Sequence, residues 1–308
     1  MSKSVLSAKH FHDEEAAYAF LEAMVWPEGP VCPHCGGFER ISKMQGKATR
    51  MGLHKCYQCR KQFRVTVGTV FEASHVPLHK WLQAMALLSS SKKGISSNQL
   101  HRTLGVTLKT AWFMSHRLRE AMRSGDLAPM GGSEEGQGGI VEADETFIGR
   151  EPGVPVRRGG LHKMKVLALI DRETGQARSM VVDDLSGKTL VPILQENIAK
   201  EASVFTDEAG QYRHLGDKFM DHQTVNHGQD EYVRGIVHTN TVEGYFSVFK
   251  RGMKGVYQHC AKKNLHRYLA EFDFRYNNRA KLGVNDVART ERLAKGIVGK
   301  RLTYRTAG

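Results

Sequence analysis

Four cysteines form two pairs with the same internal spacing, Cys32 with Cys35 and Cys56 with Cys59. Each Cys-x-x-Cys turn holds two sulfur atoms close together, and two such turns can surround one Zn²⁺ ion as a tetrahedron. A disulfide framework or a redox pair is the alternative, but paired turns at this distance, in a chain without an export signal, favour zinc. The spacing therefore predicts one structural zinc ion, bound by a small ribbon of short strands.

Three carboxylates farther along the chain stand where a second kind of metal site could form: Asp144, Asp207 and Glu243. We expect Asp144 and Asp207 each to end a β-strand, at the sheet edge where ligands gather in α/β domains. Glu243 is expected just inside a helix that follows a short strand at 235–237. Carboxylates suit hard cations such as Mg²⁺ or Mn²⁺. Two such ions roughly 4 Å apart can clamp the attacking and leaving oxygens of a phosphoryl displacement.

Each acid alone has a simpler interpretation, because a strand-terminal aspartate is most often a turn or cap residue. The order of the acids along the chain favours the combined site, and so do the basic residues that follow. Lys250 lies seven residues after Glu243 on the same helical face, and Arg251 is next to it. A cation there could hold a phosphate; a solvated helix face would show the same pattern.

Two short helices joined by a tight turn at Gly105 precede these acids, at about residues 96–104 and 107–122. This order is typical of a helix-turn-helix, in which the second helix contacts DNA. An ordinary helical hairpin is the alternative. The basic residues of the second helix are the predicted DNA contacts: Lys109, His116, Arg117 and Arg119.

The composition indicates a polyanionic partner. The chain has 308 residues, and 45 Lys and Arg against 32 Asp and Glu leave a formal net charge of +13. Such a surplus is typical of nucleic-acid binding, although charge for solubility is the alternative. No apolar run reaches the roughly 20 residues that span a membrane, and the first residues lack the apolar core of a signal peptide. We therefore expect a cytoplasmic protein, with Cys260 as a thiol that has no role.

The pattern of elements predicts a multidomain chain. After residue 139, three strands, a helix, a fourth strand and further helices follow in an α/β order. A stretch rich in Gly, Ser and Glu separates this part from the helices before it. The predicted boundaries are an N-terminal helix and zinc ribbon at 1–72, the helix-turn-helix region at 73–124, a linker at 125–138, the catalytic α/β domain at 139–285 and a basic C-terminal tail at 286–308.

Residues 139–149, 204–208 and 238–252 resemble the catalytic blocks of bacterial insertion-sequence transposases of the DDE type. More narrowly, they resemble the ISXO-type group, in which a zinc ribbon and a helix-turn-helix precede the catalytic domain, and residues 265–279 resemble its closing helix. The resemblance covers most of the chain. It implies an RNase H-like, DDE integrase-type core that uses two Mg²⁺ or Mn²⁺ ions.

The resemblance also implies roles for single residues. Asp144 and Asp207 match the first two acids of the family. Some members carry an Asn followed by a Lys at the third position, and this chain has both Asn240 and Glu243, three residues apart. A carboxylate holds Mg²⁺ better than an amide does, so we expect Glu243 to be the ligand, with Asn240 orienting water. Lys250 is expected to contact phosphate.

These observations predict a transposase that binds the terminal inverted repeats of its own element, cuts them and joins them to target DNA. Its partner would be double-stranded DNA, both element ends and target, on which it would assemble as a homo-oligomer, associated with a bacterial nucleoid and with no membrane. Two alternatives remain: a non-enzymatic zinc-ribbon regulator that binds DNA, and an RNase H-like nuclease that cuts without joining.

Overall fold

The computed structural model describes residues 4–303 except 126, 133–137, 214, 230 and 232. The chain divides into two compact units, Met1–Arg123 with Gly283–Gly308, and Ser124–Leu282. The division after Arg123 falls beside the predicted linker, of which 126 and 133–137 lie outside the described residues.

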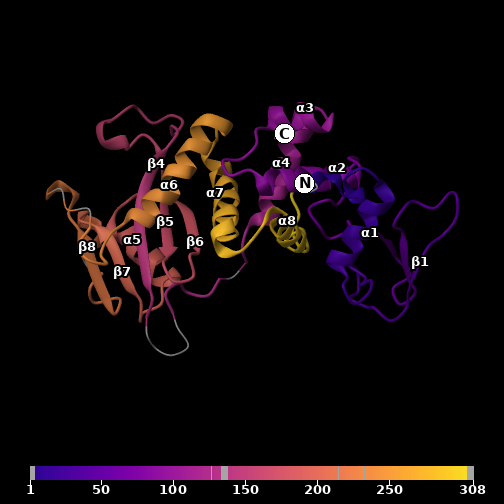
Figure 1. The fold of residues 1–308 in the computed structure, drawn as a ribbon, viewed down its shortest axis with the longest axis horizontal. Coiled ribbons are helices and arrows are strands. Elements are labelled where there is room, and N and C mark those ends of the chain that lie inside the picture. Colours follow the sequence, from indigo (N-terminus) through magenta and orange to yellow (C-terminus); the bar gives the residue numbers. More distant parts are fainter. Residues whose placement is uncertain are drawn as a thin grey trace. The chain divides into compact units, whose positions relative to one another are not determined.

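The N-terminal unit combines a small sheet with a group of helices (Figure 1). Its sheet has the antiparallel order β1-β2-β3, from Ile41–Lys43, His54–Cys56 and Gln62–Phe63. Its α-helices are α1 (Glu14–Val25), α2 (Leu78–Ser90), α3 (Ser97–Leu104), α4 (Leu108–Met122) and α8 (Asp286–Lys295). Two short 3₁₀ helices, Val5–Ser7 and Lys9–Phe11, precede α1.

The helix pair α3 and α4 begins and ends as its sequence predicts. The Ser96 hydroxyl accepts a hydrogen bond from the Gln99 N–H at 3.1 Å, and the Thr107 hydroxyl accepts one from the Thr110 N–H at 3.2 Å. Gly105 ends α3 in the left-handed conformation, with φ of 61°, which glycine adopts without steric strain. Local capping chemistry therefore defines both helices.

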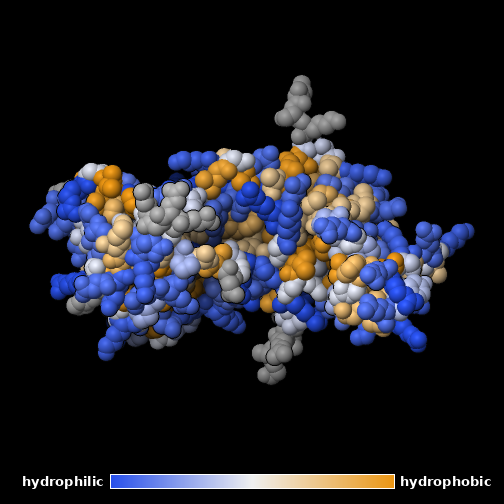
Figure 2. Space-filling model, turned by 90° about the horizontal axis from the view of Figure 1, so that it is seen from below, coloured by the Kyte–Doolittle hydropathy of each residue, from blue (hydrophilic) through white to orange (hydrophobic). Residues whose placement is uncertain are grey.

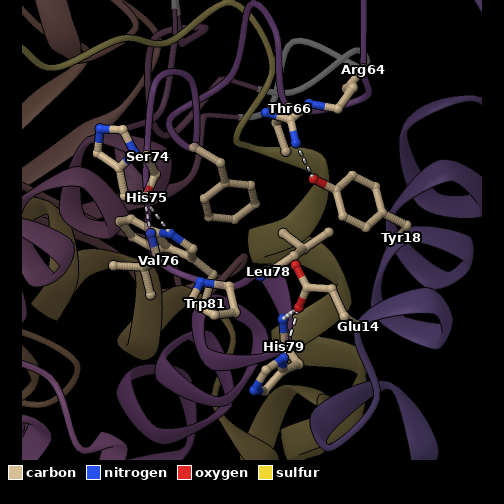
Figure 3. Close-up of a pocket in the computed structure, with 12 residues that line it drawn as sticks. Glu14, Tyr18, Arg64, Thr66, Ser74, His75, Val76, Leu78, His79 and Trp81 are labelled. Carbon is tan, nitrogen blue, oxygen red and sulfur yellow. Dashed lines mark hydrogen bonds and ion pairs between the residues drawn. The ribbon is translucent and has the colours of Figure 1, made fainter. Parts of the chain in front are cut away.

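A carboxylate from α1 holds the start of α2 (Figure 3). Glu14 accepts hydrogen bonds from the backbone N–H groups of Leu78 and His79, at 2.7 and 3.0 Å. These N–H groups have no partner within the helix, so an external carboxylate stabilises its first turn. These residues line a pocket of about 400 Å³. Arg64 and Tyr18 also line it, and Arg64 donates a hydrogen bond of 2.9 Å to the Tyr18 hydroxyl. Together these contacts join the zinc ribbon to the helices of its unit.

The segment predicted as a basic tail, 286–308, differs from that expectation, because it contains α8. This helix packs against α2, and Leu293, Ala294 and Ile297 are fully buried. The Thr290 and Ser89 hydroxyls are 2.9 Å apart. The buried positions follow helical spacing. The many basic residues around them hid this pattern in the sequence. Residues 304–308 lie outside the described part of the chain.

The C-terminal unit contains a five-stranded sheet in the order β6-β5-β4-β7-β8. β4 (Ile140–Ile148), β5 (Met164–Asp171) and β6 (Ala177–Val182) are antiparallel, whereas β7 (Ser203–Asp207) and β8 (Asp221–Val225) run parallel to β4. The helices are α5 (Gly187–Asn197), α6 (Asn240–Gly252), a π-helical continuation at Met253–Tyr257, and α7 (Lys262–Asn277). Short 3₁₀ helices occur at Arg158–Gly160, Gly210–Tyr212, His227–Gln229 and Ala280–Leu282.

Helices cover both faces of this sheet. On one face, α6 and α7 pack against alternate residues of β5, including Val166 and Ala168 (Figure 1). On the other face, Leu190 and Leu194 of α5 pack against the remaining residues of β5, such as Leu167. All eight residues of β5 are buried, so the sheet is the middle of three layers.

Hydrophilic residues, blue in Figure 2, cover most of the face drawn there. Among the described residues, no helix is both long and apolar enough to cross a bilayer.

The packing of α8 predicts a test by substitution. Leu293→Ala removes a fully buried side chain and should lower the free energy of unfolding of the N-terminal unit by about 2–5 kcal/mol. Val287→Ala, on the same helix but 48% exposed, should leave it nearly unchanged. Equal effects of the two substitutions in urea unfolding would show that α8 does not belong to the core of this unit.

Candidate active site and zinc site

The four cysteines of the ribbon form one cluster. Their sulfur atoms all lie within 4.8 Å of one another, with Cys32 to Cys59 at 3.6 Å and Cys35 to Cys56 at 3.7 Å. Zinc with Zn–S bonds of about 2.3 Å separates tetrahedral sulfurs by about 3.8 Å, so the arrangement fits the ion. A backbone N–H of Cys59 directed at Cys56 lowers the pKa of that thiol to about 7, which favours the thiolate that binds metal.

The three predicted acids lie in one cleft of the C-terminal unit. This cleft has a volume of about 590 Å³, and Asp144, Asp207, Glu243 and Lys250 all line it, together with Thr239, Phe246 and Ser247. The residues come from two strands and one helix that are far apart in sequence. The fold therefore brings together the acids and the cation that the sequence analysis selected.

The sheet places the two aspartates side by side. β4 and β7 are parallel, with Glu142 opposite Phe205, and two more residues along this register bring Asp144 opposite Asp207 on the same face. The predicted position of Asp144 at a strand end was wrong, because β4 continues to Ile148. Buried Thr146 and Ile148 follow the aspartate, so the strand continues past it.

Glu243 and Lys250 reach the cleft from α6. Glu243 is in the first turn, where the Thr239 hydroxyl donates a hydrogen bond to its carboxylate at 3.0 Å. Lys250 lies two turns farther along, with its Nζ 5.9 Å from the centre of the Phe246 ring. Asn240 begins the helix, is exposed, and is not among the described residues that line the cleft. The predicted strand at 235–237 is absent; Arg234 and Val237 form one isolated β-bridge.

The cleft is electrostatically prepared for a cation. Burial, and then the charges of Glu145, Asp207 and Glu243, raise the pKa of Asp144 to about 7. A divalent cation among these oxygens would reverse this effect, because it favours the ionised carboxylate. Glu145 itself points to the other face of β4, where its carboxylate accepts a hydrogen bond from Gln211 at 3.1 Å. The oxygen donors of the cleft thus fit Mg²⁺ or Mn²⁺.

A fourth acid, Glu142, determines where α6 begins, and the sequence analysis missed it. Its side chain is fully buried. One carboxylate oxygen accepts hydrogen bonds from the Thr241 and Val242 N–H groups, both at 2.9 Å, and the other accepts one from Arg172 Nε at 2.5 Å. Glu142 therefore caps the helix that carries Glu243. The sequence did offer a sign of this role. Glu142 is an acid inside an apolar strand, and it lies two residues before Asp144, which puts both on the same face of the sheet.

The predicted DNA contacts of α4 are only partly accessible. Lys109 is exposed near the start of the helix, but His116, Arg117 and Arg119 are buried. Arg117 donates hydrogen bonds to the carbonyl oxygens of Val70 and Glu72, at 2.9 and 2.8 Å. All three side chains are thus buried, and Arg117 joins α4 to the segment at 70–72. The second half of α4 faces the core of its unit, which basic side chains in the sequence did not reveal.

On α6, the predicted DNA contact Arg251 is exposed. Its guanidinium donates to the Ser247 hydroxyl at 3.0 Å.

Comparisons with known proteins agree with this architecture. Residues 137–277 match the ISXO2-like transposase domain, and residues 12–62 match a transposase zinc-ribbon domain. Together the two matches cover more than half of the chain. The chain belongs to the ISXO2-like DDE transposases with an N-terminal zinc ribbon.

One relative is similar along nearly its whole length. An uncharacterised protein in the transposable element ISH50 of Halobacterium salinarum is 29% identical over 287 residues, which cover 88% of this chain and 93% of the relative. That organism is an archaeon, so the comparison does not support the bacterial origin that the resemblance implied.

Two solved structures show weaker similarity. The simian T-cell lymphotropic virus intasome in complex with PP2A regulatory subunit B56 gamma has a TM-score of 0.30 and 13% identity, over 56% of this chain and 63% of that chain. A pre-cleavage Mos1 transpososome has a TM-score of 0.28 and 15% identity, over 72% and 80%. Because both scores are low, the RNase H-like fold is assigned from the sheet order and the family match.

The cysteine cluster predicts a metal-dependent ribbon. Cys56→Ser should remove the bound zinc and unfold the ribbon, since a segment this small has little other core. Cys260→Ser, outside the cluster, should keep about one zinc per chain. Metal analysis of both purified variants provides the measurement, and full zinc content in Cys56→Ser would contradict the ligand assignment.

The contacts of Glu142 predict a large effect on stability. Glu142→Gln leaves Arg172 without its carboxylate partner and weakens the cap of α6. The free energy of unfolding of the C-terminal unit should therefore fall by about 3–5 kcal/mol. Glu196→Gln, an exposed position on α5, is the matched control. Similar urea midpoints for the two variants would show that Glu142 does not hold α6.

Proposed function

We propose that this chain binds the inverted-repeat ends of its own mobile element, cuts them, and joins the freed 3′-OH to target DNA. The observation that carries the proposal is the convergence of Asp144, Asp207, Glu243 and Lys250 in one cleft. Three carboxylates beside a lysine suit phosphoryl transfer, in which metal ions and a phosphate are held together.

Asp144, Asp207 and Glu243 are the proposed ligands of two Mg²⁺ or Mn²⁺ ions. When bound, such ions stabilise charge at the phosphorus and on the attacking and leaving oxygens. Lys250 contacts a phosphate of the DNA from the same helical face as Glu243. The protein forms no covalent intermediate; water and then the 3′-OH are the nucleophiles.

Glu243 is the stronger candidate for the third ligand. It lines the cleft and Asn240 does not. The hydrogen bond from Thr239 also orients its carboxylate. Asn240, one turn earlier at the start of α6, would orient water or the backbone of the DNA.

The N-terminal unit is the proposed reader of the element ends. The formal charge of +13 favours DNA through its phosphates. Lys109 and Trp112 are exposed in the first two turns of α4, the part of a recognition helix that contacts bases. Joining two ends to one target needs more than one active site, so the active form is a homo-oligomer on DNA.

Substitutions of the acids test the proposed chemistry. Asp144→Asn, Asp207→Asn and Glu243→Gln should each lower cleavage and strand transfer of duplexes that carry the inverted repeats by about 10³-fold. Binding of the same duplexes should be nearly unchanged. Asn240→Ala should only weaken activity. Active Asp variants would place the chemistry elsewhere, and cleavage without joined products would identify a nuclease.

The raised pKa of Asp144 gives a second readout that does not depend on activity. Because the folded protein holds this proton more tightly, metal-free protein should lose stability as the pH rises from 3.8 to about 7. Asp144→Asn removes the titrating group, so above this range the metal-free variant should be at least as stable as the parent. Added Mg²⁺ should raise the melting temperature of the parent and not of the variant. Equal responses would argue against a metal site.

A further inference from the structure

A second pocket, of about 260 Å³, lies in the C-terminal unit where β4 and α6 end. Its floor is apolar and rigid. Ile148, Met164 and Met253 are all at least 95% buried and belong to the core between the sheet and α6. Phe147 also lines the pocket. Such a surface accepts a flat apolar group, and methionine adapts well to an aromatic ring.

The rim of this pocket is positively charged. Lys163 and Lys254 line it, and no carboxylate among the described residues pairs with either of them. The one acid of the loop at 149–163, Glu151, is already engaged by Lys262, at 2.6 Å, and by Lys165, at 3.8 Å. The rim therefore presents two cations to an anionic ligand.

The backbone on one side of the pocket is unusual. Met253–Tyr257 is π-helical, and Gln258, which lines the pocket, has φ of 57° and ψ of −53°. Both conformations are rare and are concentrated at functional sites. Tyr257 holds the segment in place, because its ring packs 4.8 Å from that of Tyr268 and its hydroxyl donates to Glu271. Gln258 thus lines the pocket with a side-chain amide, which has donors and an acceptor for a ligand.

The pocket and the catalytic cleft share the same two elements. Lys250 in the cleft and Lys254 at the pocket are four residues apart, about 6 Å along a helix. Asp144 and Ile148 are four residues apart on β4, about 13 Å along a strand. A DNA strand advances about 3.4 Å per nucleotide, so the pocket is within a few nucleotides of a phosphate held in the cleft.

We propose that this pocket binds one unpaired nucleotide of the DNA substrate, next to the cut site. The base lies on Ile148, Met164 and Met253, and its phosphate lies beside Lys163 and Lys254. A volume of about 260 Å³ admits one base, and a floor whose residues are at least 95% buried is out of reach for a base held within the duplex stack. The nucleotide must therefore leave the stack. This inference rests on the proposed function, since it takes element-end DNA as the substrate.

Fluorescence of 2-aminopurine tests the inference without requiring cleavage. The probe is a duplex carrying the inverted repeat that flanks the gene, with 2-aminopurine placed in turn at each position near the cut site. On binding to the full chain in EDTA, emission should rise several-fold at one position, because that base unstacks. Cys260→Phe, which fills the pocket, should abolish the rise, whereas Cys260→Ala, which keeps it open, should retain it. If the protein binds and cuts the duplex but emission changes at no position, the inference about this pocket is wrong and the proposed function still stands.

The lysines provide an independent arm. Lys163→Ala with Lys254→Ala should reduce the slope of log affinity against log salt by about 1, as expected when one phosphate loses its cations, and should lower the fluorescence change. Lys188→Ala with Lys200→Ala removes the same charge from exposed positions outside the pocket and should alter the slope less. Equal slopes for the two pairs would overturn the assignment of the rim. A protein that unstacks the base but never cuts DNA would instead contradict the proposed function.

Discussion

The buried carboxylate of Glu142 is the interaction on which the candidate active site depends. It joins the centre of the sheet to the first turn of α6 through two backbone N–H groups and to Arg172 through a charged hydrogen bond. Because Glu243 is in that first turn, any change in where α6 begins would move the third acid relative to Asp144. A buried charge is unfavourable unless its partners are complete, so this contact tolerates few alternatives.

The same sheet accepts an unfavourable arrangement of charge in order to form the cleft. Parallel pairing of β4 with β7 brings Asp144 and Asp207 together on one face, and burial raises the pKa of Asp144. Neutral residues there would make the metal-free fold more stable. The arrangement is understandable if a bound cation supplies the missing positive charge, as expected for a member of the DDE transposases.

Local patterns in the sequence predicted local structure well. Cysteine spacing predicted the ribbon cluster, and capping residues such as Ser96 and Thr107 predicted the ends of the helix pair, because in each case the interacting groups are close in sequence. The direction in which a side chain faces, toward the core or toward solvent, was less predictable. The sequence could not show that His116 and Arg119 turn inward, or that Glu142 would meet a helix one hundred residues later, since both depend on packing between distant segments.

The return of α8 to the N-terminal unit has a consequence for synthesis of the chain on the ribosome. Domains usually fold as they emerge, beginning with the N-terminal one. Here the core beneath α2 stays open until Leu293 and Ile297 have been made, after the whole C-terminal unit. A chain released early would expose apolar surface and invite degradation. The topology thus makes a complete N-terminal unit depend on synthesis of the C-terminal unit that precedes α8.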